Sequence, residues 1–159
     1  MRSIVLYSSK SGNTKKLADT VYASLPEPKE VCPLGERPAS LEPYDLIAFG
    51  FWFQGGQPDA DSLAALPQIK DKNLFLFASH GAAKKSAHAT KGMNTAKELA
   101  SSCRVIGTFN CQGEVNPKVI DTAKKKPEPP AWLDDAPAAI GHPNEDDLTE
   151  LKKIIAECL

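Results

Sequence analysis

Five short apolar runs alternate along the chain with segments of helical periodicity. The runs are predicted strands, at residues 3–7, 29–32, 44–51, 73–78 and 104–109. Between them, residues 14–25 space apolar side chains at helical intervals, a short helix begins near Asp59, and residues 87–101 form a longer helix. Because alternating strands and helices connect by right-handed crossovers, the pattern predicts an α/β fold: a doubly wound parallel sheet with helices on both faces.

The alternation stops at residues 114–143, which contain "KKKPEPPAW" and "DDAPAAIGHP". Proline excludes a regular helix over most of this length, so we expect an irregular connection, either an ordered loop or a mobile flap. Asn144 is then the expected N-cap of a closing helix whose core-facing residues are Leu148, Leu151, Ile154 and Ile155. Residues 1–159 are therefore predicted to form a single domain.

Composition narrows the function classes. A chain of 159 residues with 42% hydrophobic content buries one core, and a net charge of −1 favours neither nucleic acid nor an anionic membrane as a partner. The longest apolar stretch, Leu46–Phe53, is too short to span a bilayer, and no signal-peptide pattern precedes the first strand. The four cysteines lack metal-site spacing. We expect a cytoplasmic monomer without membrane insertion or a bound metal.

The turn between the first strand and the first helix, "YSSKSGNTKKLA", is rich in hydroxyl and amide side chains. A helix N-terminus favours negative charge, and Gly12 allows close approach of the backbone, so a phosphate fits this turn. Lys15 and Lys16 lie where the helix dipole disfavours cations, which also indicates a nearby anion. The spacing matches neither the nucleotide P-loop nor the dinucleotide fingerprint. The alternative is a serine-rich turn that only caps its helix.

Three loops are expected at the carboxyl edge of the sheet, where doubly wound folds bind ligands. Residues 8–14 suit a phosphate, residues 51–59 carry three aromatic side chains beside a Gly-Gly pair, and residues 79–83 are small enough for a flat ring to approach. Together they predict a planar aromatic ligand with a phosphate tail.

The run Ser9-Lys10-Ser11-Gly12-Asn13-Thr14 resembles the phosphate loop of the flavodoxin family, Thr/Ser-x-Thr/Ser-Gly-x-Thr. More narrowly, "GFWFQGGQPD", "GTFNCQG" and "HPNEDDL" resemble a BilS-like bacterial subgroup of flavodoxin-like proteins. The resemblance covers nearly the whole chain. It implies a three-layer, five-stranded parallel sheet of order 2-1-3-4-5 and non-covalently bound FMN.

The resemblance also implies which residues contact the cofactor. From the three loops they are Ser9, Lys10, Ser11, Gly12, Asn13 and Thr14; Phe51, Trp52, Phe53 and Gly55; and Ser79, His80 and Gly81. The third loop lacks the tyrosine that many flavodoxins stack on the outer face of the flavin. Trp132 is a candidate cover for that face, and packing on the domain surface is the alternative.

Three functions are compatible with these residues. The first is an FMN-binding electron carrier between a reductase and a client oxidoreductase, with redox proteins as partners. The second is an NAD(P)H-dependent FMN reductase of a quinone or other small acceptor, although no nicotinamide site is identified in the sequence. The third is a cofactor-free, flavodoxin-shaped binding module, which Trp52 and the intact hydroxyl loop disfavour.

Overall fold

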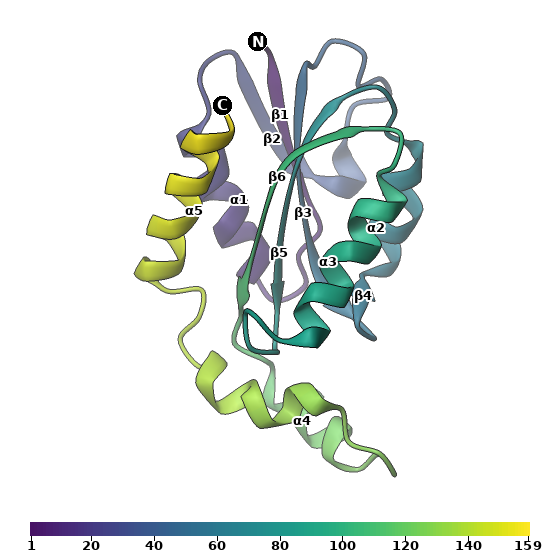
Figure 1. Ribbon diagram of the computed structural model, residues 1–159, viewed down its shortest axis with the longest axis vertical. Helices are drawn as coiled ribbons and strands as arrows, with labels where there is room; N and C mark the ends of the chain where they lie inside the picture. Colours follow the sequence, from purple (N-terminus) through teal and green to yellow (C-terminus); the bar gives the residue numbers. More distant parts are fainter.

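The centre of the molecule is a parallel sheet, seen in a computed structural model that describes residues 1–159 (Figure 1). Its strands, in spatial order, are β2 (Lys29–Pro33), β1 (Ser3–Tyr7), β3 (Leu46–Gln54), β5 (Asn73–His80) and β6 (Arg104–Gln112). A two-residue strand, β4 (Gln57–Pro58), pairs antiparallel with the end of β3. The predicted 2-1-3-4-5 order is confirmed, since β5 and β6 are the fourth and fifth parallel strands along the chain.

Two helices cover each face of the sheet (Figure 1). On one face, α1 (Asn13–Ser24) and α5 (Glu145–Cys158) contribute Leu17, Val21, Leu151 and Ile155 to a buried cluster. On the other, α2 (Ala60–Ala65) and α3 (Ala87–Leu99) contribute Ala65, Met93 and Ala96 to a second cluster. Short 3₁₀ turns follow β2 and α2, at η1 (Leu34–Glu36) and η2 (Leu66–Gln68). None of the helices combines the length and the apolar character needed to cross a membrane.

Three strands extend beyond their predicted ends. β3 continues to Gln54, where its last residues pair with β4. β5 continues to His80 and β6 to Gln112 because these two ends pair with each other. The second and third loops at the carboxyl edge are therefore shorter than predicted, and Trp52, Ser79 and His80 project from regular strands.

Residues 114–143, hereafter the connecting segment, are more regular than predicted. They contain an eight-residue helix, α4 (Pro117–Lys124), and a 3₁₀ element, η3 (Ala131–Ala139). Pro117 occupies the first helical position, where its missing N–H costs nothing, and the Asn116 side chain accepts a hydrogen bond from Lys118 N at 2.9 Å. The expectation of an irregular connection is therefore wrong over α4. The segment lies beyond the carboxyl ends of β5 and β6 (Figure 1).

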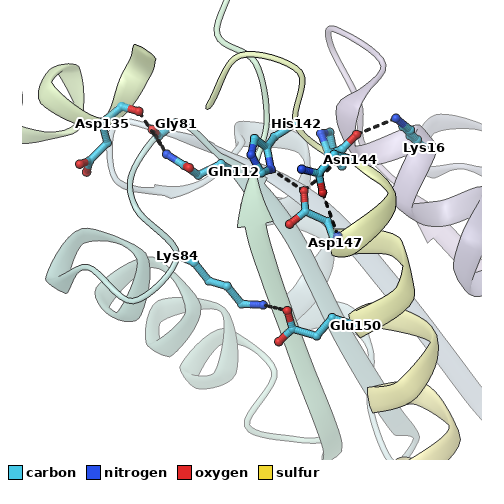
Figure 2. Close-up of polar contacts among 10 residues, drawn as sticks. Lys16, Gly81, Lys84, Gln112, Asp135, His142, Asn144, Asp147 and Glu150 are labelled. Atoms are coloured by element: carbon cyan, nitrogen blue, oxygen red, sulfur yellow. Dashed lines mark hydrogen bonds and ion pairs between the residues drawn. The ribbon is translucent and has the colours of Figure 1, made fainter. Parts of the chain in front are cut away.

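The connecting segment returns to the domain at the start of α5, as Figure 2 shows. Asn144 is the N-cap, as predicted: its side chain accepts from Asp147 N at 3.1 Å, and the Asp147 carboxylate accepts from Asn144 N at 2.8 Å. The same carboxylate lies 2.6 Å from His142 Nδ1. Lys16 Nζ donates to the carbonyl of Pro143 at 2.6 Å. These contacts fix where α5 begins.

Candidate cofactor site

The three predicted loops and the connecting segment enclose one cleft of about 1060 Å³ at the carboxyl edge of the sheet. This volume is slightly above the usual range for small-molecule sites, about 300–1,000 Å³. Ten of the predicted contact residues line it: Lys10, Ser11, Asn13, Thr14, Trp52, Phe53, Gly55, Ser79, His80 and Gly81. Ser9, Gly12 and Phe51 do not.

The turn before α1 presents a set of unpaired backbone amides. The N–H groups of Ser9, Lys10, Ser11, Asn13 and Thr14 have no acceptor in the protein. The Ser11 side chain is exposed and makes no hydrogen bond, and no acidic residue lies in the first turn of the helix. Unpaired amides at the positive end of a helix form an anion site.

Ser9 and Gly12 stabilise the conformation of this turn but do not line the cleft. Ser9 Oγ accepts hydrogen bonds from Gly12 N and Lys15 N, both at 3.2 Å, so it takes the capping role. Gly12 has a φ of 94°, a left-handed conformation that favours glycine.

The structure also corrects one inference about the lysines that follow this turn. Lys15 pairs with Asp19 at 2.8 Å, and Lys16 donates to the Pro143 carbonyl. Their positions need no anion to explain them.

Thr14 joins the first loop to the third. Its side chain is buried, and its Oγ1 lies 2.9 Å from Ser79 Oγ and 3.4 Å from the carbonyl of Phe51. Phe51 itself is fully buried, and its ring belongs to the core cluster under α2 and α3. The prediction that the Phe51 side chain contacts a ligand is therefore wrong. Successive strand residues point to opposite faces, and Phe51 points to the core.

Asp59 holds the first and second loops together. Its buried carboxylate accepts from Ser8 Oγ at 2.8 Å, from Ser62 Oγ at 2.9 Å, from Ser62 N at 3.2 Å and from Trp52 N at 3.3 Å. Its own N–H donates to the Trp52 carbonyl at 2.9 Å. Asp59 is thus both the N-cap of α2 and the residue that positions Trp52 relative to the anion site.

A tight hairpin follows Trp52. Gly55 and Gly56 have φ values of 63° and 80°, as a two-residue turn between antiparallel strands requires. Trp52 is half-buried. Lys10 Nζ lies 5.6 Å from the centroid of the Trp52 ring, which is a cation–π distance. This contact places the first loop directly beside the aromatic wall of the second.

His80 is a buried imidazole in the cleft wall. It is 6% exposed, its Nε2 donates to Asn110 Oδ1 at 2.8 Å, and its Nδ1 has no partner in the protein. The Phe53 ring packs between His80 and His88, with centroid distances of 4.7 and 5.8 Å. Burial lowers the pKa of His80, although the hydrogen bond to Asn110 opposes this effect. The side chain is thus a neutral group with one free acceptor nitrogen.

This lowered pKa predicts a pH dependence of folding. The unfolded chain takes up the proton of this imidazole first, near the ordinary pKa of about 6.5, so the free energy of unfolding is expected to fall as the pH drops below that value. Substitution His80→Gln is expected to lower stability at pH 7 but to flatten the decrease between pH 7 and pH 5. Urea unfolding at both pH values measures this, and an unchanged slope would contradict it.

The connecting segment supplies another part of the cleft wall. Gly81 allows close packing there, because a Cβ atom at this position would lie 2.8 Å from Val115 Cγ2 and 3.3 Å from Trp132 Cε3. Gln112 Nε2 donates to the carbonyls of Gly81 and Asp135, at 3.3 and 3.2 Å (Figure 2). Trp132 is half-buried and lines the cleft, so it lies at the site and not on a remote surface.

Several residues at or beside the site were not identified from the sequence. They include Asp59 as the link between two loops, His88 and Lys91 in the cleft wall, and Gln112 beside Gly81. The position of Asp59 could have been inferred from the sequence. A capping residue that follows a Gly-Gly hairpin within a few residues lies close to the end of the strand before the hairpin. His88 and Lys91 lie on α3, and Gln112 lies at the end of β6. Only the tertiary fold brings His88 and Lys91 into the cleft wall and places Gln112 against Gly81.

Comparisons with known proteins agree with this geometry. A family model described as "Flavodoxin domain" matches residues 4–156. A protein of Clostridioides difficile (strain CD3), named flavodoxin-like domain-containing protein BilS, is 33% identical over 119 residues, which cover 72% of this chain and 68% of that protein. The predicted resemblance to the BilS-like subgroup is confirmed.

Two solved structures share the fold. Oxidised flavodoxin 2 from Bacillus cereus superimposes with a TM-score of 0.68 at 16% identity, covering 99% of this chain and 97% of that one. A flavoprotein in complex with FMN from Lactobacillus acidophilus NCFM superimposes with a TM-score of 0.57 at 19% identity, covering 69% of this chain and 92% of that one.

Proposed function

Because this chain belongs to the flavodoxin family, a family of FMN-binding proteins, we propose that it carries electrons on a bound FMN between a reductase and a client oxidoreductase. The observation that carries the proposal is the set of five unpaired amides before and at the start of α1, directly beside an aromatic-lined cleft. A phosphate-tailed flavin needs these two features side by side.

The residues present fit such a ligand. The free amides and the Ser11 hydroxyl donate to the phosphate, and Ser9 and Gly12 stabilise the conformation of the turn. The cleft has a single acidic lining residue, Glu114, and its side chain is exposed. Little negative charge therefore opposes the phosphate.

The other end of the cleft fits a flat ring. Trp52 and Trp132 both offer aromatic surface to the cleft, and the open space around the α-carbon of Gly55 leaves room for the ring edge. His80 forms part of the cleft wall and packs against the Phe53 ring, and the connecting segment forms another part of that wall. When bound, FMN supplies one- and two-electron redox chemistry, and the surrounding residues tune its potential.

A spectroscopic titration tests the proposal. Purified protein is titrated with FMN while the flavin absorbance is followed, and the complex is then reduced stepwise without oxygen. Stoichiometric binding followed by two resolved one-electron reductions supports an electron carrier. Direct two-electron reduction by NAD(P)H would instead support the small-molecule reductase. Absence of binding at micromolar FMN would overturn both and leave the cofactor-free module.

Trp132 is expected to cover one face of the flavin. Substitution Trp132→Ala removes a stacking contact worth about 0.5–1.5 kcal/mol, so the Kd for FMN should rise by about two- to tenfold. The fluorescence of the bound flavin should also increase, because the tryptophan no longer quenches it. Ile140→Ala is the control, since Ile140 is 67% exposed on the same segment and does not line the cleft. An unchanged Kd and unchanged fluorescence in Trp132→Ala would contradict this assignment.

A further inference from the structure

The mouth of the cleft carries an excess of positive charge. Four lysines line it, Lys10, Lys91, Lys118 and Lys126, against one acidic residue, Glu114. All five side chains are exposed, and none of the four lysines forms an ion pair. The lining thus has a charge of +3, whereas the whole chain has −1, so the remaining residues sum to −4.

From this asymmetry we propose that the mouth of the cleft docks an acidic face of a redox partner protein. The proposal rests on the electron-carrier function above, which it deepens by naming the kind of partner. The lysines come from separate elements: the turn before α1, helix α3, helix α4 and the stretch that follows α4. The fold therefore gathers positive charge at this opening from places distant in the sequence.

The cofactor phosphate does not account for most of these lysines. Only Lys10 belongs to the turn with the free amides, whereas Lys91, Lys118 and Lys126 lie on α3 and on the connecting segment. Three positive charges thus stay available to an incoming molecule.

Apolar surface lies among these lysines. Val119 is 46% exposed, and it lines the cleft together with the partly exposed Pro130 and Trp132. A small apolar centre with a charged rim is the usual anatomy of a protein–protein interface.

The charge distribution favours an acidic protein over a nucleic acid. A long polyanion also contacts the surface beyond the mouth, and the residues outside the cleft, whose charges sum to −4, give it no net attraction. A discrete acidic face of a protein meets the lysines alone. Such complementarity accelerates encounter about 10- to 10³-fold at low salt and keeps the complex short-lived, which suits electron exchange at the opening of the cofactor site.

The test uses FMN-loaded protein and two probe proteins of opposite charge, cytochrome b5 (acidic) and cytochrome c (basic). Association is measured by calorimetry or NMR titration, and electron transfer is measured by stopped-flow oxidation of the chemically reduced protein, one electron per oxidised haem. Both are repeated between about 10 and 300 mM salt, where screening weakens exposed charge interactions. The FMN affinity of every variant is measured first, so that rates are compared for fully loaded protein.

The variant is Lys118→Glu with Lys126→Glu, and the matched control is Lys152→Glu with Lys153→Glu, two exposed lysines on α5 away from the cleft. Both change the net charge equally. The acidic probe is expected to associate and react faster with the wild type, and the cleft variant is expected to slow this reaction at least tenfold at low salt while the control changes it less than threefold.

Equal effects of the two variants, or a preference for the basic probe, would overturn the docking proposal. Salt-sensitive association with the acidic probe but no electron transfer would overturn the proposed carrier function and leave the docking surface standing. Loss of both would overturn both.

Discussion

Replacing Ser11 with aspartate is expected to weaken FMN binding by about ten- to a thousandfold while leaving the fold intact. Ser11 is exposed beside the free amides of the turn before α1 and makes no hydrogen bond, so the folded protein tolerates the change. A carboxylate there repels the phosphate, at a cost of about 1.4–4 kcal/mol for charges roughly 4 Å apart near a protein surface. Calorimetric titration of both proteins with FMN measures the change.

Riboflavin separates this effect from a general disturbance of the cleft, because it has the same ring without the phosphate. Its affinity is expected to be nearly equal in wild type and Ser11→Asp. Ser101→Asp is the matched control, since Ser101 is exposed in the turn that follows α3 and does not line the cleft. Equal losses for riboflavin and FMN would place the phosphate elsewhere.

Substitution Asp59→Ala is expected to lower the free energy of unfolding by about 2–4 kcal/mol. It removes the N-cap of α2, worth about 1 kcal/mol, and leaves the hydroxyl donors of the half-buried Ser8 and the buried Ser62 without an acceptor, at about 1–3 kcal/mol. FMN affinity should fall as well, because the backbone of Trp52 loses its link to the first loop. Urea unfolding of the protein with and without FMN measures both effects.

Asp61→Ala provides the comparison for Asp59→Ala. Asp61 lies in the first turn of the same helix, but it is exposed and its carboxylate accepts no hydrogen bond, so its loss is expected to cost less than about 1 kcal/mol. Asp59→Asn keeps an acceptor oxygen and should fall between the two. If Asp59→Ala unfolds with the same free energy as Asp61→Ala, the hub role of Asp59 is wrong.

The sheet was predictable because its signal is local. Runs such as "NLFLFA" are apolar throughout, as strands buried on both faces must be, and the order of the strands follows from the family resemblance. Helix α4 was not predictable from proline content alone, because the effect of a proline depends on its position. Pro117 starts a helix, whereas a proline further inside would break one.

The candidate site likewise has parts that the sequence predicts and parts that it does not. The turn with the free amides lies within one short stretch of chain, so side-chain type and spacing were sufficient to single it out as a candidate anion site. Phe51 was assigned wrongly because the strand continues past it, and the face to which each residue points depends on where the strand ends. The part of the wall where Trp132 lies beside Gly81 joins positions about fifty residues apart in sequence, a pairing that no local pattern contains.

The connecting segment is attached to the domain at both ends. Near its start, Asn13 Nδ2 donates to the carbonyl of Glu114 at 3.1 Å. Near its end, Lys16 Nζ donates to the carbonyl of Pro143. Between these anchors, the exposed Lys124–Lys126 stretch offers trypsin a cleavage site. A single cut there leaves two fragments whose shared interface includes Leu151 and Ile155 of α5 in the core. The stretch is therefore a suitable position at which to divide the chain, and we expect two separately expressed pieces to associate through this core interface.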